Sequence, residues 1–337
     1  MLSLPFYLHL HLLHCYPTMT SEAASYQRLS PKAALQLMSA HTWVAAIAPV
    51  IVGGTLTIGL RDYTPLDLLT HNWLALLIGV LMLFTAVLAQ SAVNTLNDYY
   101  DFKSGTDTEE NCVDTTDAAI IYHKLNPKTA RNYAFALIAA AAIIGCIIAV
   151  LTSPLILLFG LVGAATLILY SGSKKSISYL PIGEIVSGFV MGGIITVATY
   201  FAMTGHISWA AVLGSLPPII TIALIMQVNN TSDIERDREA GRRTLPILIG
   251  AKRSAPMIAT LQVLVLLFCA LYCLFVAPLG IAIIVLAAIL SVKRIRLLWS
   301  GPYSAENRPA VMKAVVAQAI LVNLAFVVAI LLGAHFV

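Results

Sequence analysis

Long apolar segments recur along the whole chain, and they restrict the fold more than any other feature of the sequence. An α-helix needs about 20 apolar residues to cross a bilayer. Nine such segments cover approximately residues 35–60, 73–96, 131–152, 154–170, 182–203, 208–229, 254–275, 277–292 and 311–334. Only 11% of the 337 residues are charged, against about 25% in a soluble domain. We therefore predict an all-α, multi-pass membrane helix bundle with nine transmembrane helices.

The positions of the Lys and Arg residues support this number of spans. If nine helices cross the membrane, the N-terminus and every second loop lie on one side. These segments contain all of the 20 Lys and Arg residues except Arg61. Because basic residues gather in cytoplasmic loops, we expect a cell-membrane protein with these loops in the cytoplasm.

Residues 1–34 form an N-terminal segment to which we assign no function. The apolar stretch from Leu4 to Leu13 is not preceded by a basic residue, as it would be in a signal peptide. Met19 is an alternative start, in which case residues 1–18 are a start-site artefact. We expect residues 35–335 to form a single membrane domain, with two four-helix halves followed by a ninth span.

Two short stretches contain most of the acidic residues. Eleven of the 16 Asp and Glu residues lie within residues 98–117 and 233–239, after the second and the sixth span. In the first stretch, polar residues at i, i+3, i+4 and i+7 predict one helical face. They are Asn94, Asn97, Asp98 and Asp101. In the second stretch, the residues that share a face in the same way are Asn230, Asp233 and Asp237.

Two opposed carboxylate faces indicate a cation between them, since they would otherwise repel each other. Hard oxygen ligands suit Mg²⁺ or Ca²⁺, and Mg²⁺ commonly joins carboxylates to substrate phosphates. Basic residues that could contact a diphosphate lie beside both stretches: Lys103, Lys174, Lys175, Arg238, Arg242 and Arg243. The alternative is that each acidic stretch is a solvated loop, but two such faces, each with preceding asparagines, favour a binding site.

These stretches resemble the motifs of the UbiA superfamily of intramembrane aromatic prenyltransferases. Residues 90–107 are similar to its first aspartate-rich motif, and residues 229–245 are similar to its second. Residues 170–175, followed by Gly183-Glu184, resemble a short loop of the same family. Within the superfamily, the motifs are most similar to the branch that prenylates 1,4-dihydroxy-2-naphthoate. The resemblance covers approximately residues 35–335.

The resemblance implies transfer of a polyprenyl chain from its diphosphate to 1,4-dihydroxy-2-naphthoate, with loss of CO₂ and formation of demethylmenaquinone. It implies Mg²⁺ as cofactor and membrane lipid as surroundings, and neither a nucleic acid nor an obligate protein partner. The residues expected to act in catalysis are Asp98, Asp101, Asp233 and Asp237. The implied metal ligands are Asn97, Asp98, Asp101, Asp107, Asn230, Asp233 and Asp237. The expected substrate contacts are Lys103, Lys175, Tyr170, Arg238, Arg242, Arg243, Gln90 and Asn94.

Departures from the family pattern leave the aromatic acceptor open. His41-Thr42-Trp43 stands where relatives usually carry an Arg-Pro pair. Other acceptors of the superfamily are 4-hydroxybenzoate, homogentisate, haem and tetrapyrroles. A secondary transporter is a further alternative, although transporters usually place ionisable groups near the midplane of the membrane. Glu184 begins the fifth predicted span, where it has either a functional role or the role of stabilising a helix N-terminus.

Overall fold

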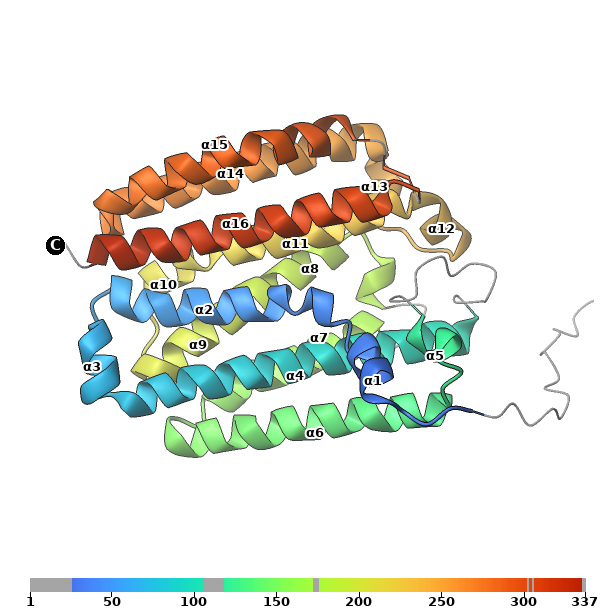
Figure 1. The fold of residues 1–337 in the computed structure, drawn as a ribbon, viewed down its shortest axis with the longest axis horizontal. Coiled ribbons are helices and arrows are strands. Elements are labelled where there is room, and N and C mark those ends of the chain that lie inside the picture. The colour runs from blue at the N-terminus through green and yellow to red at the C-terminus, as the bar shows by residue number, and fades with distance from the viewer. Residues whose placement is uncertain (1–25, 106–117, 172–175, 302, 305, 335–337) are drawn as a thin grey trace, which may run out of the picture.

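The structure, a computed structural model, describes residues 26–105, 118–171, 176–301, 303–304 and 306–334. Within these ranges every regular element is a helix, and none is a strand. The long helices run side by side along the molecule (Figure 1). The prediction of an all-α helix bundle is therefore confirmed.

Nine long helical segments account for most of the described chain. They are α2 (Val44–Gly59), α4 (Trp73–Ser104), α6 (Pro127–Leu151), α7 (Ile156–Ser171), the continuous run of α8 (Gly183–Ser187), η3 (Gly188–Ile194) and α9 (Ile195–Thr204), the pair α10 (Trp209–Gly214) and α11 (Leu216–Ser232), α14 (Ala251–Val276), α15 (Ile281–Ser300) and α16 (Arg308–Ala334). Short helices connect them: α1 (Pro31–Leu37), η1 (Ala40–Thr42), α3 (Pro65–Thr70), α5 (Ala119–Tyr122), η2 (Ile177–Tyr179), α12 (Ile234–Glu239), α13 (Leu245–Ile249) and η4 (Pro278–Gly280).

Seven helical segments of the described ranges are long and apolar enough to cross a membrane. The predicted span 154–170 corresponds to α7, a shorter apolar helix. The predicted span 277–292 lies mostly in α15, whose last two turns contain Lys293, Arg294 and Arg296. The chain is thus an integral membrane protein, whereas the number of nine spans remains a prediction.

The first predicted span begins later in the structure than the sequence indicated. The chain leaves α1 at Met38, and Ser39 adopts a left-handed conformation with φ of 46°. A non-glycine residue in this region interrupts a right-handed helix. The segment before α2 is therefore a separate short helix, and the long helix begins at Val44.

Two buried apolar clusters hold the long helices together, and α2 and α9 contribute to both. One cluster joins them to α14, α15 and α16 and includes Leu56, Tyr200 and Phe326. The other joins them to α4, α6 and α7 and includes Ile148 and Phe201. Because lipid is as apolar as these side chains, close packing rather than burial from water stabilises such contacts.

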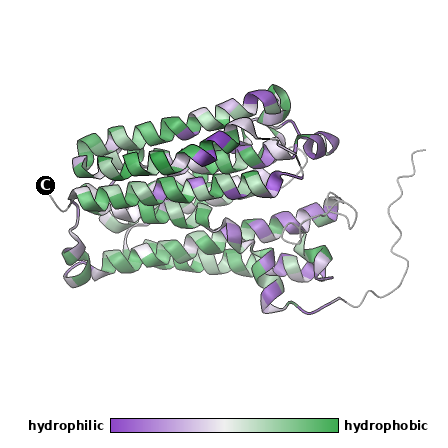
Figure 2. Ribbon diagram, turned by 45° about the horizontal axis from the view of Figure 1, so that its top comes forward, coloured by the Kyte–Doolittle hydropathy of each residue, from purple (hydrophilic) through white to green (hydrophobic). Residues whose placement is uncertain are grey.

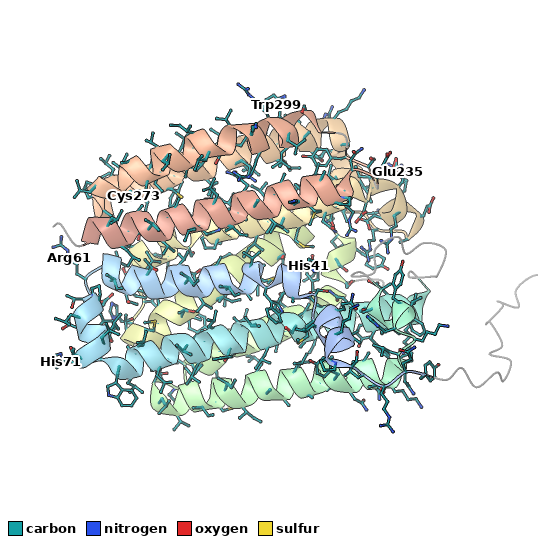
Figure 3. All side chains as sticks on the ribbon, viewed as in Figure 1. His41, Arg61, His71, Glu235, Cys273 and Trp299 are labelled. Carbon is teal, nitrogen blue, oxygen red and sulfur yellow. The ribbon has the colours of Figure 1, made fainter. Side chains whose placement is uncertain are left out.

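The acidic stretches lie at the same end of the bundle, which we call the acidic end. α4 and α11 end there, and α8 and α16 begin there, on the side where α5, α12 and α13 appear in Figure 1. Figure 2 shows hydrophilic residues gathered at this end, while hydrophobic residues dominate the length of the helices. Glu235 lies at the acidic end, and Arg61 and His71 lie at the opposite end (Figure 3).

The length of α4 explains why its polar turns reach this end. A helix of 32 residues is about 48 Å long, which exceeds the apolar core of a bilayer, about 30 Å thick. The last turns of α4, with the first acidic stretch, can therefore extend beyond the lipid. The helix ends at Gly105, whose φ of 73° suits glycine, and its N–H caps the carbonyls of Asp101 and Phe102.

Close backbone packing places α8 and η3 against α11. A Cβ on Gly188 would lie 2.5 Å from the backbone oxygen of Ile219, and one on Gly192 would overlap the backbone nitrogen of the same residue. Only glycine permits such an approach of two helices. The backbone of η3 is π-helical, a distortion often found near functional sites.

Candidate active site

The first acidic face lies on the last turns of α4. The side chain of Asp98 is buried, and its Oδ2 accepts a hydrogen bond from the backbone N–H of Ala119, at 3.0 Å. This bond attaches the start of α5 to α4. Asn97 and Asp101 are half-buried on the same part of the helix.

Gln90 and Asn94 lie earlier on α4 and bind the chain between α1 and α2. The Asn94 amide donates to the carbonyl of Met38 at 2.9 Å and to the Thr42 hydroxyl at 2.8 Å. The Gln90 amide also donates to Thr42, at 3.3 Å. The structure therefore gives both residues a positioning contact, and their predicted contact with substrate remains a prediction.

The second acidic face continues from α11 into α12. Asp233 is the residue between the two helices, and the backbone N–H of Asp237 donates to its carbonyl at 2.8 Å. Asp237 is only 3% exposed. Burial raises the pKa of its carboxyl group to about 6, with Arg242 opposing the shift and the charge of Asp233 adding to it.

Arg242 connects the two acidic faces. Its Nη1 donates to Asp237 Oδ1 at 3.1 Å, and its Nη2 lies 4.0 Å from Asp101 Oδ1. A turn with Gly241 at φ of 77° returns the chain toward Asp237. The guanidinium also lies over the ring of Tyr179, 5.4 Å from its centroid. One cation thus bridges α4 and α12, which places the two predicted faces at a single site.

Arg308 is a site residue that the sequence analysis missed. It begins α16, and its Nε lies 3.3 Å from Asp233 Oδ2. Its Nη2 donates to Asn229 Oδ1 at 2.9 Å. In the sequence it is one of several basic residues in a loop, and no spacing relates it to the acidic stretches. Only the packing of α16 against α11 brings it there.

A fifth carboxylate joins the second face from α8. Glu184 is 3% exposed, and its Oε1 accepts a hydrogen bond from the Asn230 amide at 2.8 Å. A Cβ on Gly183 would lie 3.5 Å from the Tyr170 hydroxyl. Tyr170 also interacts electrostatically with Glu184, Arg242 and Asp237. The predicted residues Tyr170, Asn230, Asp237 and Arg242 therefore lie together.

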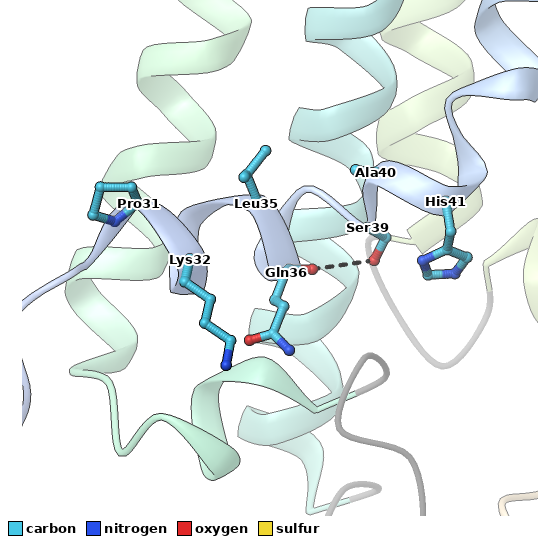
Figure 4. A pocket seen from close by; sticks show the side chains of 7 residues that line it. All are labelled: Pro31, Lys32, Leu35, Gln36, Ser39, Ala40 and His41. Atoms are coloured by element: carbon cyan, nitrogen blue, oxygen red, sulfur yellow. Dashed lines mark hydrogen bonds between the residues drawn. The ribbon is translucent and has the colours of Figure 1, made fainter.

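The other predicted residues lie around this group or outside the described chain. Lys103, Arg238 and Arg243 have exposed side chains at the acidic end, and the backbone N–H of Arg243 donates to the carbonyl of Tyr179 at 2.9 Å. Asp107 and Lys175 lie outside the described residues. A separate pocket of about 440 Å³ is lined by residues of α1, Ser39 and η1 between Pro31 and His41 (Figure 4), none of which was predicted to act in catalysis.

The donor set suits a hard cation, although the carboxylates now contact arginines. In the ranges that the structure describes, no three Asp, Glu, His or Cys side chains lie close enough together to hold a metal ion. The Asp237 Oδ2 atom is nevertheless buried and accepts no hydrogen bond from any described residue. Carboxylate and amide oxygens of this kind are the ligands that Mg²⁺ prefers, so the residues fit this metal by their chemistry.

The model of the UbiA prenyltransferase family matches residues 46–316, which include both acidic faces, Arg242 and Arg308. The chain belongs to the UbiA prenyltransferase family. The resemblance noted in the sequence is thereby confirmed.

Similar proteins agree with this assignment. This prenyltransferase is 37% identical over 224 residues to the 1,4-dihydroxy-2-naphthoate octaprenyltransferase of Bacillus subtilis (strain 168), a match that covers 66% of the chain and 68% of the relative. It is 27% identical over 233 residues to a UbiA prenyltransferase domain-containing protein 1 homolog of Drosophila melanogaster, covering 67% of the chain and 60% of that relative. The chain thus spans less than two thirds of the insect protein.

A solved structure shows the same fold. It is a UbiA homolog from Archaeoglobus fulgidus bound to DMAPP and Mg²⁺, with a TM-score of 0.57 and 17% identity. The likeness covers 88% of this prenyltransferase and 99% of the archaeal chain. At this identity the comparison concerns the fold alone.

Proposed function

We propose that this membrane prenyltransferase transfers a polyprenyl chain from its diphosphate to 1,4-dihydroxy-2-naphthoate, with loss of CO₂ and formation of the reduced, quinol form of demethylmenaquinone. The observation that carries the proposal is the bridge of Arg242 between Asp101 and Asp237. Two carboxylate faces from distant parts of the chain meet there, which supports a site for a metal-bound diphosphate. The naphthoate acceptor is supported by the activity in the name of the Bacillus subtilis relative.

The carboxylates of both faces would hold Mg²⁺. Asp98 and Asp101 would contribute from α4, and Asp233 and Asp237 from α11 and α12, with Asn97 and Asn230 beside them. When bound, the metal would neutralise the diphosphate and the charge that develops on it as it leaves. Asp107 and Lys175 remain proposed contacts of the same site.

In this proposal, Arg242 and Arg308 bind carboxylates in the free protein and the diphosphate in the substrate complex. Without substrate, their guanidinium groups neutralise Asp237, Asp101 and Asp233, as their contacts indicate. When the diphosphate is bound, the same N–H groups can donate to its oxygens, because a guanidinium binds phosphate as readily as carboxylate. Lys103, Arg238 and Arg243 would add positive charge at the edge of the site.

The reaction forms one C–C bond and breaks two bonds. The C–O bond of the prenyl diphosphate breaks, and its electron pair leaves with the diphosphate. The ring carbon of the acceptor that carries the carboxylate attacks the allylic carbon. That carboxylate then leaves as CO₂, and the electrons of its bond restore the aromatic ring. Tyr170 interacts electrostatically with Glu184, Arg242 and Asp237, and in this proposal its π face flanks the allylic cation.

The membrane accommodates the isoprenoid tail. The tail is as apolar as lipid and can stay among the helices, while the diphosphate reaches the acidic end. The distribution of basic residues supports a cytoplasmic position for this end in the cell membrane.

A turnover assay tests the proposal. Purified protein in lipid nanodiscs receives Mg²⁺, 1,4-dihydroxy-2-naphthoate and prenyl diphosphates of several lengths, and products are identified by mass spectrometry. We expect prenylated, decarboxylated product, none with EDTA, and none from Asp98→Asn, whose remaining oxygen can still accept from Ala119. Glu235→Gln, an exposed acid on α12, is the control and should keep full activity. Formation of product only with another aromatic acceptor would refute the naphthoate assignment. Solute transport without any prenylation would refute the assignment of the protein as an enzyme.

A further inference from the structure

Glu184 is an ionisable side chain buried where a membrane helix begins. It is 3% exposed and lies in the first turn of α8, which continues through η3 into α9. Burying a carboxylate in such surroundings is costly, and residues that are kept there usually serve a function. Its side chain does not cap the helix N-terminus. It instead reaches across to Asn230 of α11.

The carboxylate of Glu184 is only half satisfied. Oε1 accepts from Asn230 at 2.8 Å, while Oε2 is buried and accepts from no described residue. Buried polar atoms are rarely left unpaired, because the loss costs about 1–3 kcal/mol. Gln227 precedes Asn230 by one turn on the same face of α11, is 2% exposed, and its Nε2 likewise donates to no described residue. Within the described part of the chain, an acceptor atom and a donor atom thus lack partners on two helices that pack together.

The depth of Glu184 Oε2 and Gln227 Nε2 in the membrane places them nearer to the expected position of the reacting carbon than to that of the diphosphate. Asn230 lies on α11, three residues before Asp233, which follows the helix. It is therefore about 4.5 Å farther along the helix axis, on the membrane side of Asp233. If Asp233 and Asp237 hold the metal-bound diphosphate, the first carbon of the prenyl chain lies on the membrane side of them, near the level of Asn230. The aromatic acceptor must reach that carbon. A carboxylate at this level repels the diphosphate and attracts a hydroxyl group.

We infer that Glu184 Oε2 accepts a hydrogen bond from a phenolic hydroxyl of the aromatic acceptor and orients the ring for attack. The inference rests on the proposed function and adds a specificity-determining residue to it. The negative charge of Glu184 draws the hydroxyl proton and raises the electron density of the ring. The proton remains on the hydroxyl, so the reaction balances with CO₂ and diphosphate as the only leaving groups. The Nε2 of Gln227 is placed to donate to an oxygen of the same acceptor.

The experiment compares hydroxyl groups on the acceptor with the carboxylate on the protein. Wild type and Glu184→Gln are assayed with 1,4-dihydroxy-2-naphthoate and with its two monomethyl ethers. The amide oxygen of the substituted side chain can still accept from Asn230, but the second oxygen and the charge are gone. We expect wild type to lose about 10- to 100-fold in kcat/KM with one ether, the size of a hydrogen bond to a charged group. The kcat/KM of E184Q with the parent acceptor should be lower than that of wild type by a similar factor. Replacing the parent acceptor by that ether should then lower the kcat/KM of E184Q no further.

A binding measurement separates this role from a role toward the metal. Mg²⁺-dependent binding of a non-reactive prenyl thiolodiphosphate, measured by calorimetry, should be the same in E184Q and wild type within about twofold, which also shows that the variant is folded. Loss of this binding by a folded E184Q would overturn the inference, as would an E184Q that still discriminates against the ether. If E184Q does not fold, the assay of the wild-type protein with the ethers is the test. A wild-type kcat/KM that is equal for both ethers and the parent acceptor overturns the inference.

The outcomes also separate the inference from the proposed function. Turnover of the naphthoate without ether discrimination keeps the proposed function and overturns the role of Glu184. Turnover of another phenol only, such as homogentisate, overturns the naphthoate assignment. The ether comparison is then made on that phenol, where a hydroxyl-dependent loss that disappears in E184Q supports the role of Glu184.

Discussion

The Nε of Arg308, at the start of the last helix, lies 3.3 Å from Oδ2 of Asp233, at the end of α11. The contact connects the C-terminal helix to the second acidic face. Arg308 also binds Asn229 through its Nη2, so its guanidinium is held in one orientation beside the carboxylates. This placement makes it a donor to the diphosphate in the proposed reaction.

Substitution of Arg308 by Gln should therefore weaken the use of prenyl diphosphate. We expect kcat/KM for the diphosphate to fall roughly 10- to 100-fold, as for the loss of hydrogen bonds to a charged group. Lys should restore part of the loss, because it keeps the charge but lacks the planar fork of N–H groups. Steady-state kinetics with Arg296→Gln, an exposed arginine of α15, provides the control. An Arg308→Gln protein with wild-type kcat/KM would show that the contact is structural only.

Arg242 should stabilise the metal-free protein. Without its guanidinium, the bridge between Asp101 and Asp237 would be lost, and the buried carboxylate of Asp237 would lose a partner at a cost of about 1–3 kcal/mol. We expect Arg242→Gln to lower the unfolding temperature in EDTA. Added Mg²⁺ should raise that temperature more in the variant than in wild type, because the metal then supplies the missing charge. Equal effects of Mg²⁺ on both proteins would refute this role.

The pKa of Asp237 predicts how stability and metal binding depend on pH. Because the folded-state pKa is raised to about 6, above the ordinary value of about 4, the ionised form is disfavoured in the fold. The metal-free protein should therefore lose stability as pH rises from about 4 through 6. Mg²⁺ affinity should change in the opposite sense and fall as pH drops through 6, since the metal binds the ionised carboxylate.

Asp237→Asn tests this pH dependence. The substitution should remove most of the stability change between pH 5 and pH 8 in EDTA and make the metal-free protein more stable at pH 8, by about 1–3 kcal/mol. It should also abolish turnover. Thermal unfolding across this pH range is the measurement, with Glu235→Gln on the same helix as control. A pH profile of Asp237→Asn identical to wild type would assign the dependence to another group.

The acidic faces could be predicted because helical spacing is a local property of the sequence. The spacing of Asn230, Asp233 and Asp237 predicted one face, but α11 ends at Ser232 and Asp237 belongs to α12. The face survives this break because the hydrogen bond from Asp237 to the carbonyl of Asp233 keeps the spacing of a helical turn. A local pattern thus predicted the shared face, although it overestimated the length of one helix.

The contacts that complete the site depend on tertiary packing and have no local signal. Glu184 meets Asn230 only because Gly188 and Gly192 let η3 approach the backbone of α11. Arg308 meets Asp233 only because α16 packs beside α11. The helix interruption at Ser39 was not predicted either, because apolar residues continue on both sides of it. Apolar periodicity predicts that helices exist, and it does not predict which polar ends they bring together.

Metal binding by single and double variants tests most directly whether both acidic faces share one site. Mn²⁺ replaces Mg²⁺ as a spectroscopic probe, and its affinity is measured by electron paramagnetic resonance with a non-reactive prenyl thiolodiphosphate present. Asp101→Asn and Asp237→Asn are compared singly and together. We predict that either substitution lowers the affinity of the same Mn²⁺, and that the double variant loses far less than the product of the two single effects. Independent, multiplicative losses, or an Asp101→Asn protein with unchanged affinity, would contradict a shared site.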